Sequence, residues 1–117
     1  MFAADSHDAA IEQMTVAYRA RTRAMLTRGA RGANFTDAEI DEFLASPSGQ
    51  SLAAMTRYTA AGTPGEVLAY LDDFAASARA DELIVAHHAQ AVDDRVRSVE
   101  LTGAAVASRR PEASPAR

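Results

Sequence analysis

The chain has 117 residues, of which 48% are hydrophobic (many of them alanine), only 6% are aromatic and none is tryptophan, so we expect one domain with a modest core. A net charge of −4 argues against nucleic-acid binding, and the absence of cysteine excludes disulfides, thiolate metal sites and thiol catalysis. No apolar run approaches the ~20 residues that cross a bilayer, and the start MFAADSHDAA does not resemble a signal peptide, so we expect a cytoplasmic protein without a membrane partner.

The N-terminal part of the chain is predicted to form a helix from residue 8 to about residue 28. Ser6 or Asp8 can serve as its N-cap, and apolar side chains then recur mostly at helical spacing. The segment RGARGAN, residues 28–34, contains two glycines and is predicted to end this helix as a linker.

Two further helices are predicted before residue 62. The first begins at Thr36, which can form a capping box with Glu39, and it stops before SPSG at residues 46–49. The second, QSLAAMTRYTAA, is expected to end at Gly62 as a C′ glycine.

The segment that follows has the clearest helical signature. Thr63 is a suitable N-cap, Pro64 occupies the first helical position, and Glu66 completes a capping box. An apolar stripe of Val67, Leu68, Leu71, Phe74 and Ala75 follows.

The hydrophobic pattern changes at Leu83–Val85, a continuous apolar run typical of a strand that is buried on both faces. This strand leads into His87 and His88. A last helix is then predicted, with Val92, Val96, Val99 and Val106 on one stripe, and residues 108–117 are predicted to be a disordered tail.

The segments GTPGEVLAYLDDFAASARADELIV and RVRSVEL resemble the C-terminal end of the bacterial-luciferase-like flavin-dependent monooxygenases. That family typically closes with a Gly-[Ser/Thr]-Pro-Glu-x-Val helix, an Ala-Asp-Glu-Leu-[Ile/Met]-Val strand and an Arg-Leu-Arg-Ser-x-Glu-Leu helix. The matching residues are Gly62, Thr63, Pro64, Glu66 and Val67, then Ala80 to Val85, then Arg95, Arg97, Ser98, Glu100 and Leu101. The opening FAADSHDAA is similar to a segment in which a late strand of the family meets its helix, so the resemblance extends from about Phe2 to Gly103.

The resemblance implies an α/β fold class, namely the C-terminal fragment of a (β/α)8 TIM barrel that is predominantly helical with one or two short parallel strands. Residues 1–107 would supply the last strand–helix units and an insertion. Because a full barrel needs about 250 residues, most strands are expected to lie upstream. The stub Met1–Asp5 is expected to pair with Leu83–Ala86.

His87 and His88 are the candidate cofactor-binding residues, because residues just past the C-terminal end of a barrel strand line the active-site face. Relatives often read Val-Thr-Thr-His here, so His88 matches a family position and His87 replaces a hydroxyl residue; a second His-Asp pair of the family is absent. Adjacent side chains point to opposite sides, so at most one histidine can face the barrel mouth. The alternative is that both are polar loop residues. No metal site is expected, since the sequence has no HExxH-type spacing.

The resemblance implies reduced flavin, FMN or a deazaflavin, as the cofactor of an oxidoreductase. This chain lacks most of the barrel, so it is expected to be inactive and not to bind flavin alone, and no catalytic residue is assigned. Its expected partner is the missing N-terminal barrel portion or a second copy of itself. The alternative function is a small helical interaction module without catalytic activity.

Overall fold

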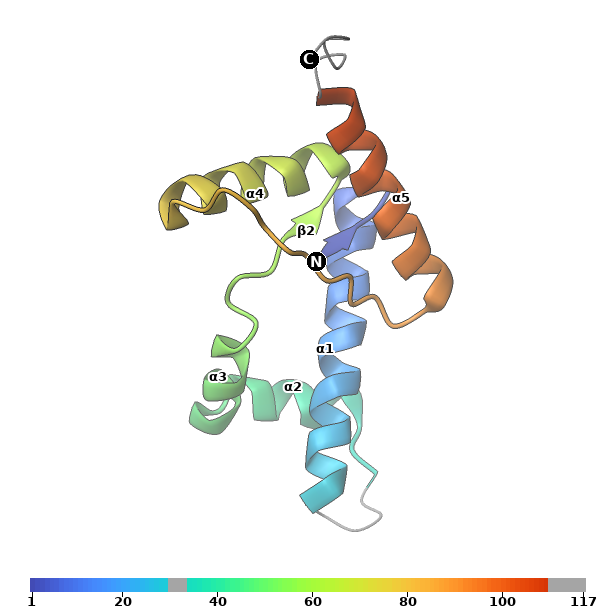
Figure 1. The fold of residues 1–117 in the computed structure, drawn as a ribbon. Helices are drawn as coiled ribbons and strands as arrows, with labels where there is room; N and C mark the ends of the chain where they lie inside the picture. The colour runs from blue at the N-terminus through green and yellow to red at the C-terminus, as the bar shows by residue number, and fades with distance from the viewer. Residues whose placement is uncertain (30–33, 110–117) are drawn as a thin grey trace, which may run out of the picture.

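The computed structural model describes residues 1–29 and 34–109 (Figure 1). These residues form five helices, namely α1 (His7–Gly29), α2 (Asp37–Ala45), α3 (Pro47–Ala54), α4 (Pro64–Ala78) and α5 (Val92–Arg109). The two strands are β1 (Phe2–Ala3) and β2 (Ala61–Gly62), and they pair in parallel. The predicted class, predominantly helical with short parallel strands, is therefore confirmed. No helix within the described ranges is long and apolar enough to span a membrane.

β1 is hydrogen-bonded along both of its edges. On one edge, the amides of Phe2 and Ala4 donate to the carbonyls of Ala60 and Gly62 at 2.9 and 3.1 Å. On the other edge, the Met1 nitrogen donates to the carbonyl of Ala86 at 2.7 Å, and the His88 amide donates to the carbonyl of Met1 at 3.3 Å. This alternation is that of a parallel ladder. β1 therefore lies between β2 and the segment Ala86–His88.

The predicted strand at Leu83–Val85 is wrong. These residues have no regular secondary structure, and the side chain of Ile84 is 97% exposed. The expected pairing with the Met1–Asp5 stub is correct at Ala86, wrong for Leu83–Val85, and extends instead to His88. A strand buried on both faces needs other elements packed over each face, and Ile84 and Val85 are exposed instead. This segment is outermost and reaches β1 through only two hydrogen bonds.

Helices cover both faces of β1. Phe2 is buried against α1 and makes an edge-to-face contact with Tyr18, with ring centroids 6.0 Å apart. The neighbouring residues Met1 and Ala3 point the other way and pack with Val67 of α4. α1 and α4 therefore lie on opposite sides of the strands, and α5 packs beside α4 (Figure 1).

The predicted starts of α2 and α4 are confirmed by their capping contacts. Thr63 accepts a hydrogen bond from the amide of Glu66, and the Glu66 carboxylate accepts one from the amide of Thr63, so the capping box of α4 is complete. For α2, the Thr36 hydroxyl accepts from the Glu39 amide at 3.2 Å.

The first of the two helices predicted before residue 62 stops before SPSG as expected, at Ala45, but the start and the end of the second helix were predicted wrongly. Ser46 is the N-cap of α3 and Pro47 is its first residue, so SPSG begins a helix instead of separating two. α3 ends at Ala54, and Gly62 lies in β2 rather than behind a helix. The capping geometry explains the error, since Ser followed by Pro serves as well for a helix start as for a loop.

The valine stripe predicted to bury α5 faces solvent. Val92, Val96, Val99 and Val106 are 39–61% exposed, whereas Ser98 and Thr102 are buried. α5 also continues to Arg109, past the predicted start of the tail at residue 108. Residues 30–33 of the predicted linker and residues 110–117 of the predicted tail lie outside the described residues, although α1 does end at Gly29 as expected.

Candidate functional site

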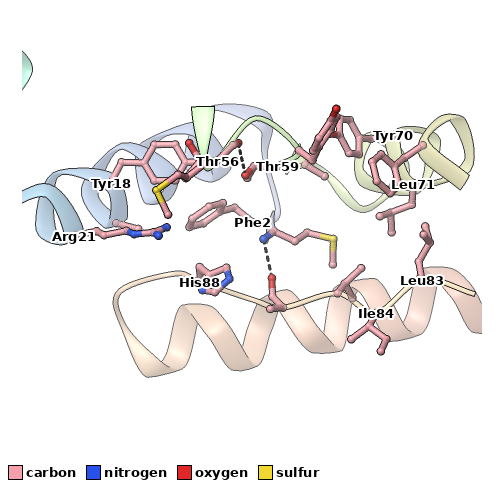
Figure 2. A pocket seen from close by; sticks show the side chains of 18 of the residues that line it. Phe2, Tyr18, Arg21, Thr56, Thr59, Tyr70, Leu71, Leu83, Ile84 and His88 are labelled. Atoms are coloured by element: carbon pink, nitrogen blue, oxygen red, sulfur yellow. Dashed lines mark hydrogen bonds between the residues drawn. The ribbon is translucent and has the colours of Figure 1, made fainter. Parts of the chain in front are cut away.

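A cavity of about 430 Å³ lies beside the first residues of β1, between α1 and α4 (Figure 2). The chain segments that precede β2 and α5 close its other sides. Its lining consists of aromatic and aliphatic side chains with a few polar ones: Met1, Phe2, Ala17, Tyr18, Arg21, Met55, Thr56, Tyr58, Thr59, Ala60, Tyr70, Leu71, Phe74, Leu83, Ile84, Val85, Ala86, His88 and Gln90. A volume of this size, lined by apolar side chains and by polar groups, is in the range of sites for small organic ligands.

One end of the cavity is basic. The side chains of Arg21 and His88 converge there, next to Phe2 (Figure 2). Burial lowers the pKa of His88, and the positive charges of the Met1 amino group and Arg21 lower it further. No Asp or Glu is among the lining residues, so this end of the cavity favours an anionic group.

The opposite end of the cavity is aromatic. The rings of Tyr70 and Phe74 are nearly parallel, with centroids 6.4 Å apart. The ring centroid of Tyr58 lies 5.4 Å from that of Phe74. Tyr58 is 69% exposed, so this wall is open toward solvent. The aromatic end offers a flat apolar surface on which a planar group could stack.

The two predicted site residues lie on different sides of their segment, as expected for neighbours in an extended chain. His88 lines the cavity, and His87 turns toward α5, where its Nδ1 lies 2.6 Å from the buried Oγ of Ser98. Burial lowers the pKa of His87, with smaller contributions from the charges of Met1 and His88. Of the pair, only His88 is placed to contact a ligand in this cavity.

Sequence reasoning missed Arg21 as a candidate site residue. Arg21 follows Met14 and Tyr18 at spacings of seven and three residues, so it shares their face of α1. The nearby arginines differ, because Arg19 pairs with Asp41 at 2.8 Å and Arg23 also pairs with α2, through Asp37. The helical spacing from Met14 was the signal that could have separated Arg21 from its neighbours.

The part of the chain that the structure describes contains no group of three or more His, Asp or Glu side chains that could hold a metal ion. The Asp72–Asp73 and Asp93–Asp94 pairs are neighbours along their helices and do not form such a group.

Comparisons of the chain with protein-family models, with curated proteins and with solved structures find no match. The residues themselves and their arrangement therefore carry the functional interpretation.

Proposed function

We propose that this chain is the C-terminal part of a luciferase-like flavin-dependent monooxygenase, and that it has no activity without the upstream strands of the barrel. The observation that supports this proposal is a strand–helix unit that occurs three times in the described structure. β1, β2 and the segment Ala86–His88 run in parallel, and each continues within a few residues into a helix, α1, α4 and α5 respectively. A parallel strand followed by a helix is the unit from which (β/α)8 barrels and other α/β folds are built. The sequence resemblance extends from the first of these units to the third, and it is strongest over the second and third.

The lining of the cavity supports a flavin as the ligand. Arg21 and His88 could bind a phosphate group at the basic end, and the Tyr70–Phe74 wall could contact a planar ring. When bound, a reduced flavin would supply the reaction with O₂, and the protein would orient it and exclude water. The open wall at Tyr58 cannot exclude water, which is the physical reason for proposing that the chain is inactive alone.

A flavin titration tests this proposal. FMN is titrated into the chain alone and into the chain co-expressed with an N-terminal luciferase-like polypeptide that ends before its last strand–helix units. We expect no quenching of FMN fluorescence by the chain alone and saturable quenching by the complex. His88→Ala should weaken binding in the complex, whereas His7→Ala, outside the cavity, should not. A stable complex that ignores FMN would refute the proposal.

The second candidate function is a small interaction module without catalytic activity, and one observation favours it. A barrel keeps its helices on the outer face of its strands, whereas α1 and α4 cover opposite faces of β1. A purified chain that unfolds cooperatively and binds neither FMN nor the upstream polypeptide would support this candidate.

A further inference from the structure

The segment Asp81–His88, with the sequence DELIVAHH, leaves one backbone edge without a partner. It lies along the outer edge of β1. Of its backbone groups, only the carbonyl of Ala86 and the amide of His88 bond to that edge. Backbone groups of successive residues in an extended segment point alternately to its two edges. Leu83, Val85 and His87 therefore direct their N–H and C=O groups away from β1, and none of them has a backbone hydrogen bond in the described structure.

Two apolar side chains of this edge segment are also exposed to solvent. Ile84 is the most exposed large hydrophobic side chain, and Val85 is 37% exposed. The edge ends at Ala89, whose carbonyl accepts a hydrogen bond from Arg95 of α5 at 3.1 Å. An open apolar edge of this kind is a template for pairing with another strand.

We propose that the edge segment pairs antiparallel with the same segment of a second copy of the chain, with Val85 opposite Val85. This inference goes beyond the proposed function and concerns the chain by itself, because in a closed barrel an upstream strand would pair with this edge. In this register Leu83 and His87 of the two copies exchange hydrogen bonds, and Ile84 packs against Ala86 of the second copy.

The distribution of charge along the segment favours a second copy of the chain as the partner, and it favours an antiparallel pairing. The segment has carboxylates at its start, Asp81 and Glu82, and imidazoles at its end, His87 and His88. With Val85 at the centre, Glu82 lies opposite His88 of the second copy, and the twofold axis produces this pair twice. A parallel arrangement would instead place Glu82 beside Glu82, which is unfavourable. Glu82 is exposed and forms no ion pair within the described structure, so its carboxylate is available.

The pairing should strengthen in mild acid. The groups that face His88 in a single chain are Arg21 of α1 and the Met1 amino group, both cationic, and they favour its neutral form together with burial. His87 faces Ser98 of α5 and the same amino group. The carboxylate of Glu82 of a second copy would favour protonated His88, so the dimer binds more protons than two single chains and gains stability in mild acid.

Sedimentation equilibrium of the full chain up to 1 mM tests the proposal. Because one strand pair is a small interface, we expect a weak dimer. Its association constant should be about threefold to tenfold higher at pH 5.5 than at pH 8.0, from two cross-strand charge pairs. Val85→Pro removes an amide that has no partner in the single chain, so it should abolish the dimer without changing the circular dichroism spectrum.

Three further variants separate this edge from other surfaces. Glu82→Lys should weaken the dimer and remove its pH dependence, and adding His88→Glu to that variant should restore pairing. Val96→Lys, on the exposed stripe of α5, should leave the dimer intact. A chain that stays monomeric at 1 mM and pH 5.5, or a dimer that resists Val85→Pro, would overturn the proposal.

Discussion

The Oγ of Ser98 in α5 lies 2.6 Å from the Nδ1 of His87, and the same Oγ accepts a hydrogen bond from the amide of Ala3 at 2.9 Å. Ser98 is completely buried. In a continued parallel ladder the Ala3 amide would reach the carbonyl of His88, so the serine hydroxyl takes the place of that carbonyl. The hydroxyl thereby completes β1 and attaches α5 to it, and its own proton is available to a neutral His87.

Ser98→Ala is therefore expected to destabilise the chain. The substitution leaves the buried Ala3 amide without an acceptor, which costs about 1–3 kcal/mol of unfolding free energy. Urea denaturation followed by circular dichroism measures the loss. Ser108→Ala is the matched control, because Ser108 is exposed near the end of the same helix and bonds only to the carbonyl of Ala105. Equal urea midpoints for the two variants would show that the Ser98 contacts contribute nothing.

Gly49 is expected to be intolerant of any side chain. It is buried in the first turn of α3, and a Cβ built there would lie 2.0 Å from the carbonyl oxygen of Phe43 in α2. Since a backbone atom cannot move aside cheaply, Gly49→Ala should force α2 and α3 apart and lower the thermal midpoint by several degrees. Gly103→Ala is the control, because a Cβ there meets nothing within 4 Å. Its midpoint should stay the same or rise, since alanine favours a helix.

The sequence predicted those elements that local chemistry determines. The N-caps at Thr36 and Thr63 and the extent of α1 depend on residues a few positions apart, and the structure agrees with each of them. The two histidines likewise diverge as expected from the geometry of an extended chain.

Burial was harder to predict, because it depends on which segments meet. Leu83–Val85 and the α5 valines have the composition of buried elements, but Ile84, Val85 and the valines are exposed and Leu83 is only half-buried. Ser98 and Thr102 are polar by composition and yet buried, because the Ser98 hydroxyl bonds to β1 and the Thr102 hydroxyl bonds to the carbonyl of Ser98. The helical spacing places Arg21 on the face of α1 that carries Met14 and Tyr18, but its position in the cavity also depends on the packing of α1 against β1.

Thr63→Ala should destabilise the start of α4 by about 1 kcal/mol, because the Glu66 amide loses its acceptor. Thr63→Ser keeps the hydroxyl and should retain most of the stability. The Glu66 carboxylate also contacts His7 at 3.0 Å, so the box connects the first turn of α1 to that of α4. Chemical denaturation of the two variants gives the comparison, and an alanine variant as stable as the serine variant would contradict it.

Acidification should destabilise the single chain below about pH 6.5, through His87 and His88. Burial is the main cause that lowers the pKa of each, so the folded chain binds fewer protons on these groups than the unfolded chain does. The stability that this difference contributes is present at a pH above the pKa of histidine in the unfolded chain, about 6.5, and it is lost as the pH falls below that value. The lowered pKa values of Asp5 and Asp41, which bond to arginines, act in the same direction but only near pH 4 and below. NMR titration of the histidine ring protons in the monomeric Val85→Pro variant should give midpoints for both residues below those in the urea-unfolded chain. Identical midpoints in the two states would contradict the partial desolvation and the nearby positive charges that lower both pKa values in the folded chain.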